Sequence, residues 1–102
     1  MTNATITEIL DDLRAADETT RRFERRYWLS SADFYELYQQ GNLDDGEHTE
    51  DFALWAGFYQ IKLDREKALQ ALSHDRLRQL RAQSKGQTIS ITPSEPSFPV
   101  AS

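Results

Sequence analysis

The order of apolar and polar positions predicts a mainly helical protein up to about residue 83. From Ile6 to Tyr27, apolar or small residues recur at alternating spacings of three and four, which places them along one side of a helix. They are Ile6, Ile9, Leu13, Ala16, Thr20, Phe23 and Tyr27. Thr5 or Thr7 is expected to cap this first helix. The regular seam is typical of a helix that packs along another helix.

Two further helices are predicted before residue 83. Ser30, followed three residues later by Asp33, predicts the start of a short helix that ends at Gly41. Thr49 opens a third helix. The apolar residues of this helix form two stripes, Phe52, Trp55, Tyr59 and Leu63 on one side and Leu54, Phe58 and Ile61 on another. Such a helix is expected to be covered on two sides. Whether it continues through Ser73 stays open at this point.

These elements favour an all-α fold in which the long first and third helices form an antiparallel hairpin. The short second helix is expected to lie across the connected end of the hairpin. Residues 1–85 would form the helical domain, and residues 86–102, with three prolines, a flexible tail whose Thr88 to Thr92 segment adds a strand to a partner. Because the seam from Ile6 to Tyr27 is longer than so small a domain is expected to cover, we predict a homo-oligomer, with a dimer favoured.

Charge narrows the class of partner. The net charge of -5 and the pI near 4.9 favour a basic protein partner over nucleic acid. The segment "RRFERRYW" offers Arg21, Arg22, Arg25 and Arg26 beside aromatic residues, which keeps nucleic-acid binding as a minor alternative. Asp17 and Glu18 lie four residues before Arg21 and Arg22, so pairing within the chain is the favoured interpretation. The chain shows neither a signal peptide nor an apolar run that could span a bilayer, and we expect a cytoplasmic protein without membrane contact.

No pattern of residues predicts catalysis, a metal site or a cofactor. The acidic turn from Asn42 to Asp51 lacks the ligand spacing of a calcium loop. His48 and His74 are far apart and have no metal-ligand partner at helical spacing. The chain has no cysteine, and its serines lie at helix caps and in the tail, where no base is placed to activate them. We therefore expect a protein that is not an enzyme.

The segment from residue 31 to residue 59 is the candidate binding surface. It carries seven of the eleven aromatic residues and seven carboxylates, without lysine or arginine. Aromatic side chains would supply contact area, while carboxylates would steer a basic partner. The residues predicted to bind the partner are Tyr35, Tyr38, Asp44, Asp45, Asp51, Trp55 and Tyr59. The alternative is that the rings of Phe34, Trp55 and Phe58 form an ordinary core.

The run "RRYWLSSADFYELYQQGNLDDGEHTEDFALWAGFYQI" resembles small acidic bacterial proteins encoded directly before ribonuclease-type toxins. The residues that carry the resemblance are Tyr27, Ser31, Phe34, Tyr35, Tyr38, Gly41, Leu43, Asp51, Phe52, Trp55, Ala56 and Tyr59. The resemblance implies an antitoxin that binds and neutralises a basic, nuclease-type partner. The alternative function is a homo-oligomeric helical scaffold or adaptor that has no toxin partner.

Overall fold

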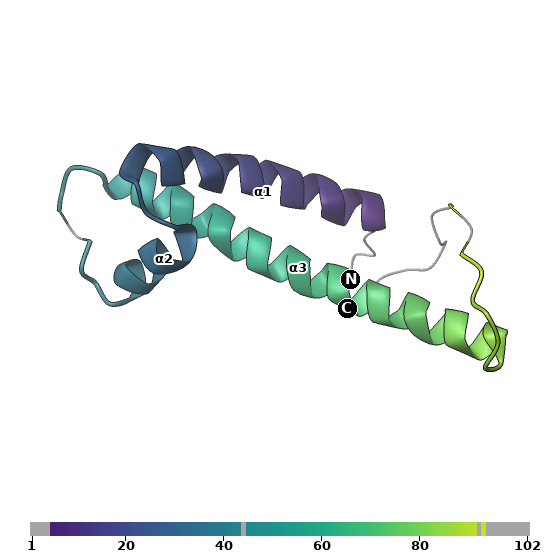
Figure 1. The fold of residues 1–102 in the computed structure, drawn as a ribbon. Coiled ribbons are helices and arrows are strands. Elements are labelled where there is room, and N and C mark those ends of the chain that lie inside the picture. The colour runs from purple at the N-terminus through teal and green to yellow at the C-terminus, as the bar shows by residue number, and fades with distance from the viewer. Residues whose placement is uncertain (1–4, 44, 92, 94–102) are drawn as a thin grey trace.

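The protein is built from three α-helices, as the computed structural model shows for residues 5–43, 45–91 and 93 (Figure 1). Helix α1 spans Ile6–Tyr27, α2 spans Ser31–Gln39 and α3 spans Thr49–Ser84. Within these residues there is no strand, so the predicted all-α class is confirmed. Residues 88–91 of the segment expected to form a strand are not in regular structure. Thr92 and residues 94–102 of the predicted tail lie outside the described residues.

Side-chain caps explain where α1 and α2 begin, whereas α3 begins without a side-chain cap. The hydroxyl of Thr5 accepts a hydrogen bond from the Glu8 amide at 3.1 Å, and that of Ser30 accepts one from the Asp33 amide at 3.1 Å. Each cap therefore satisfies an amide that has no partner within the first turn of its helix. Helix α3 begins at Thr49, where the sequence predicted it, and runs without a break through Ser73.

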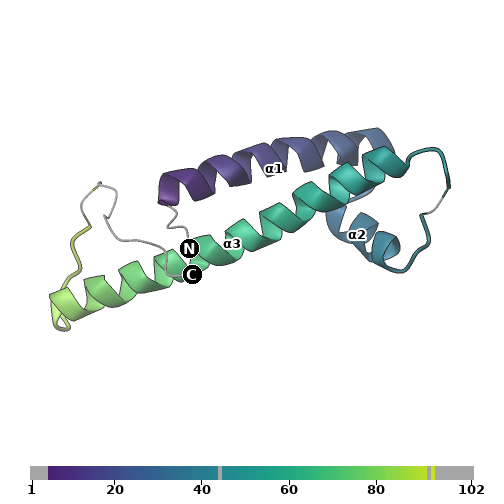
Figure 2. The ribbon, with the colours of Figure 1, turned by 180° about the vertical axis from the view of Figure 1, so that it is seen from behind.

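Helices α1 and α3 lie side by side and run in opposite directions (Figures 1 and 2). The end of α1 meets the beginning of α3, where the ring centroids of Tyr27 and Phe52 are 5.5 Å apart. Nearer the start of α1, Arg65 Nε lies 2.7 Å from a carboxylate oxygen of Asp12. Of the predicted seam, Ile9, Ala16, Thr20 and Phe23 are buried. Ile6, Leu13 and Tyr27 are half-buried. One chain thus covers most of its own seam, and the expected dimer stays a prediction.

The core lies at the end of the molecule where all three helices meet. Its buried members are Phe23, Phe34, Phe52, Trp55 and Ala56. At the other end, α3 continues past the start of α1 (Figures 1 and 2). Within the described residues, no helix has the length and apolar character needed to cross a membrane.

Candidate protein-binding surface

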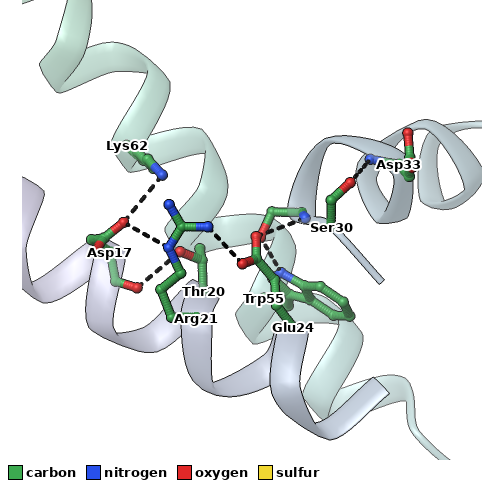
Figure 3. A network of polar contacts seen from close by, with 9 residues as sticks. Asp17, Thr20, Arg21, Glu24, Ser30, Asp33, Trp55 and Lys62 are labelled. Carbon is green, nitrogen blue, oxygen red and sulfur yellow. Dashed lines mark hydrogen bonds and ion pairs between the residues drawn. The ribbon is translucent and has the colours of Figure 1, made fainter. Parts of the chain in front are cut away.

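Trp55 is a core residue. Its side chain is completely buried, and its ring stacks on Phe34 with centroids 3.8 Å apart. Its indole Nε1 donates a hydrogen bond to Ser31 Oγ at 2.8 Å, and Figure 3 shows this bond as a dashed line from Trp55. Its predicted role as a partner-binding residue is therefore wrong, because α1, α2 and α3 already cover it. Phe34, also fully buried, follows the alternative interpretation of the aromatic residues as core.

The three tyrosines of the predicted surface lie together on the α2 side of α3. Tyr35 packs against Tyr59, with ring centroids 5.2 Å apart, and its hydroxyl donates a hydrogen bond to Gln60. Both tyrosines are half-buried. Tyr38 stacks beside Tyr35 at 6.5 Å and remains 39% exposed. Of the three, Tyr38 therefore presents the most surface to a partner.

A groove of about 210 Å³ lies beside Tyr38, between the end of α2 and the beginning of α3. It is lined by Tyr38, Gly41, Leu43, Thr49 and Phe52. Gly41 has φ +76°, a conformation that glycine adopts without strain and that turns the chain out of α2. Since an apolar cavity of about 150 Å³ is enough to hold benzene, the groove can receive one aromatic or aliphatic side chain.

Asp45 shapes the turn that leads into α3. One oxygen of its carboxylate accepts hydrogen bonds from the amides of Glu47 and His48 at 2.9 and 3.0 Å. The other lies 2.9 Å from Nδ1 of His48. The hydrogen bond from the His48 ring and those from the two amides lower the pKa of Asp45 to about 2, and Asp45 in turn raises the pKa of His48. Asp45 is thus engaged within the turn, while Asp44 lies outside the described residues.

Asp51 also acts within the chain. Its carboxylate accepts a hydrogen bond from the Tyr27 hydroxyl at 2.6 Å and lies 3.4 Å from a guanidinium nitrogen of Arg26. Burial of Tyr27, followed by the hydrogen bond to Asp51, raises the pKa of the phenol. This contact ties the end of α1 to the beginning of α3, so Asp51 has a structural role beside any contact it makes with a partner.

Four carboxylates of the segment from residue 31 to residue 59 that were not among the predicted site residues are exposed. They are Asp33, Glu36, Glu47 and Glu50. Their side chains form no ion pair or hydrogen bond with the part of the chain that the structure describes. Glu47 and Glu50 belong to the acidic run that the sequence indicates, but the sequence does not reveal that they stay exposed while Asp45 binds the backbone of its own turn.

Trp28 is an exposed aromatic residue that was not among the predicted site residues. It follows the last residue of α1, its side chain is 92% exposed, and its φ of 58° lies in the left-handed region. A left-handed conformation is strained for a residue with a side chain. No sequence signal marks it, since glycine is the usual residue at such a helix end. The structure holds a large apolar ring in solvent at the corner between α1 and α2.

The arginines near the end of α1 divide into two groups. Arg21 contacts Glu24 at 2.8 Å and Asp17 at 3.4 Å (Figure 3), and Arg26 contacts Asp51, as described above. Arg22 and Arg25 are exposed and make no ion pair with the described residues. Pairing within the chain therefore accounts for Arg21 and Arg26, whereas the expected pair of Arg22 with Glu18 is not formed among the described residues.

Glu24 links this arginine network to α2. Its carboxylate accepts hydrogen bonds from Arg21 and from the Ser31 amide, the latter at 2.9 Å (Figure 3). Burial opposes its charged form, but these hydrogen bonds outweigh burial and lower the pKa of Glu24. The first turn of α2 is therefore anchored to α1 beside the Trp55 indole.

Among the described residues, no group of three or more histidine, aspartate or glutamate side chains is arranged to hold a metal ion. Comparison of the chain with protein-family models, with curated proteins and with solved structures found no significant match. The resemblance to toxin-neutralising proteins therefore stays a prediction from the sequence.

Proposed function

We propose that this protein binds a basic, nuclease-type protein partner at the α2 end of the molecule and neutralises it, as an antitoxin does. The observation that carries the proposal is the groove beside Tyr38, whose lining includes Thr49, a close neighbour along the chain of the exposed Glu47 and Glu50. The resemblance of residues 25–61 to toxin-neutralising proteins supports it. On this proposal the protein is not an enzyme and acts by covering the surface of its partner.

The two kinds of residue would act at different steps of binding. Glu36 and Glu47 attract lysine and arginine side chains of the partner, which speeds encounter and makes the association rate depend on salt. Tyr38 and the groove bury an apolar side chain of the partner, which slows dissociation. Trp28 would add a second aromatic contact at the same end of the molecule. A nuclease blocked in this way cannot reach RNA phosphate with its basic residues.

The test uses the purified product of the neighbouring gene and measures both rate constants. Tyr38→Ala is expected to raise the dissociation rate about 30-fold, the equivalent of about 2 kcal/mol. Its matched control is Leu10→Ala, a similarly exposed apolar residue on α1. Glu47→Lys is expected to slow association and to flatten its salt dependence. Its control is Glu66→Lys, which makes the same change of charge on an exposed position of α3.

Asp45 is not a suitable target, because its removal would disturb the turn rather than the charge alone. The proposal is contradicted if both Tyr38→Ala and Glu47→Lys bind as the wild type does, or if the neighbouring protein does not bind at all. In either case the aromatic groove would be an ordinary part of the fold.

A second candidate function is a homo-oligomeric helical scaffold or adaptor. The observation that favours it is the apolar surface that α3 keeps on its outer side, where Leu54 and Ile61 are 48% and 42% exposed. The two candidates separate in a pull-down from the native host. Recovery of copies of this chain alone would favour the scaffold, and recovery of the neighbouring gene product the antitoxin.

A further inference from the structure

Helix α3 has a third side that neither α1 nor α2 covers. Its contacts with α1 include Trp55 and Arg65, and those with α2 include Trp55 and Tyr59. Leu54 and Ile61, seven residues apart, lie on a different side and are 48% and 42% exposed. Phe58 is half-buried and lies three residues after Trp55 and four before Lys62, which both contact α1, so it belongs to the side that faces α1. We call Leu54, Gly57 and Ile61 the outer face of α3.

Nothing within the single chain requires a glycine at position 57. It lies inside α3, its φ is not positive, and a Cβ atom placed on it would meet nothing within 4 Å. Glycine in the interior of a helix is less favourable than almost any other residue. A glycine next to exposed apolar side chains does, however, allow a second helix to approach the backbone closely.

We propose that a second copy of this chain docks on the outer face, with the two α3 helices antiparallel and crossing at Gly57. The distribution of charge along α3 determines the relative direction of the two helices. Its first part, Thr49–Gln60, has two carboxylates and no basic residue. With the axis at Gly57, Thr49 of one copy lies beside about residue 65 of the other, and the basic residues of that stretch are Lys62 and Arg65. Antiparallel helices therefore place Glu50 and Asp51 of one copy near Lys62 and Arg65 of the other, whereas parallel helices would oppose like charges.

The residues around Gly57 fit a two-fold axis at that point. Leu54 lies three residues before Gly57 and Ile61 four residues after it, so each Leu54 comes to lie near the other copy's Ile61. Glu50 lies seven residues before and Arg65 eight after, so the same arrangement brings each Glu50 near an Arg65. Arg65 binds Asp12 through Nε but stays 43% exposed, which leaves its remaining nitrogens free to contact Glu50.

This interface is separate from the groove of the proposed function. Helix α2 packs on Trp55 and Tyr59, and Tyr59 is about 140° around α3 from Leu54, at 3.6 residues per turn. The groove beside Tyr38 therefore stays open in the pair. The inference does not depend on a toxin partner, since either function can be carried out by a dimer.

The first test compares oligomeric states by analytical ultracentrifugation over a range of concentrations. The wild type is expected to dimerise, and Ile61→Asp to be monomeric with unchanged helical circular dichroism. Leu10→Asp places the same charge on a comparably exposed residue of α1 and should dimerise like the wild type. Gly57→Gln puts a good helix former into open space, so it should raise the melting temperature of the diluted monomer while it weakens dimerisation at least tenfold.

Three results would overturn the inference. They are a wild type that stays monomeric, a dimer that tolerates both Ile61→Asp and Gly57→Gln, and a dimer that Leu10→Asp dissociates equally well.

The second test determines the direction of the helices. The chain has no cysteine, so Glu50→Cys and Arg65→Cys can be made separately and mixed under oxidising conditions. A disulfide requires Cα atoms within about 7 Å. The antiparallel pair predicts a crosslink between the two variants and little crosslinking of either variant alone. Efficient crosslinking of Glu50→Cys to itself would show a parallel pair and overturn the proposed geometry.

Discussion

Two aspartates next to the beginning of α3 show that a carboxylate in an acidic run need not be available to a partner. Asp45 binds two amides and the His48 ring, and Asp51 binds the Tyr27 hydroxyl. Both therefore stabilise the fold at the end of the molecule that we propose as the binding surface. Among the described residues of this segment, the exposed carboxylates that form no ion pair or hydrogen bond are those of Asp33, Glu36, Glu47 and Glu50.

The contact between Asp45 and His48 predicts how the turn responds to pH. The pKa of His48 is raised above its ordinary 6.5, so its contribution to stability is complete below about pH 6.5 and is lost as the pH rises through the raised value. The pKa of Asp45 is lowered from 3.8 to about 2, so its contribution is complete above about pH 4 and is lost as the pH falls toward 2. The turn should be most stable between these limits.

An NMR titration of the His48 ring tests this expectation. In Asp45→Asn the hydrogen bond to a charged carboxylate is removed, so the pKa of His48 should fall toward 6.5. The same variant should reduce the stability of the turn at pH 5, seen as faster amide exchange at Glu47 and His48. A pKa of His48 that is the same in both proteins would show that the contact is not formed in solution.

At the scale of the elements, α3 has one part that packs against other helices and one part that does not. Its first part packs on α1 and α2, while its last turns extend past the start of α1 (Figure 2). Leu77 in this part is 40% exposed. An isolated helix of a few turns is marginally stable in water, so the last turns depend on helix propensity and on continuity with the packed part.

Hydrogen exchange should reveal this difference. The amides of residues 77–84 are expected to exchange much faster than those of residues 52–63, because no described helix covers them and they open without unfolding the core. Measurement by mass spectrometry or NMR at neutral pH distinguishes the two segments. Equal protection along α3 would contradict the expectation and would place a covering partner on the last turns as well.

At the scale of the whole molecule, the proposed surfaces lie on different sides. The groove is at the α2 end, and the outer face of α3 lies away from α2. If both proposals hold, one dimer binds two partners, and light scattering of the complex should give the mass of two chains and two partners. Ile61→Asp should then form a complex of one chain and one partner, with an unchanged affinity for each groove.

Loss of partner binding in Ile61→Asp, with the helices intact, would contradict this separation. It would show that the outer face itself contacts the partner, and the dimer proposed at Gly57 would have to be replaced by that contact. If Ile61→Asp instead forms the same two-to-two complex as the wild type, Ile61 does not lie in the dimer interface.

The helices and the positions where they begin followed from the sequence because their signals are local, whereas the continuity of α3 through Ser73 did not. A hydroxyl at Thr5 or Ser30 caps an amide three residues away, and the seam of α1 repeats with the turn of the helix. The all-α class, the start of α3 at Thr49 and the burial of Ile9, Ala16 and Phe23 could therefore be predicted. Each depends on residues within a few positions of one another or on a regular pattern.

The candidate site could be predicted only in part, because its properties arise from residues far apart in the chain. Trp55 became core once Phe34 and Ser31, more than twenty positions earlier, closed over it. Asp51 became structural through Tyr27, 24 positions away. Burial and charge pairing of this kind depend on how α1, α2 and α3 pack against one another, and the spacing of residues along one helix contains no information about the helix that will cover it.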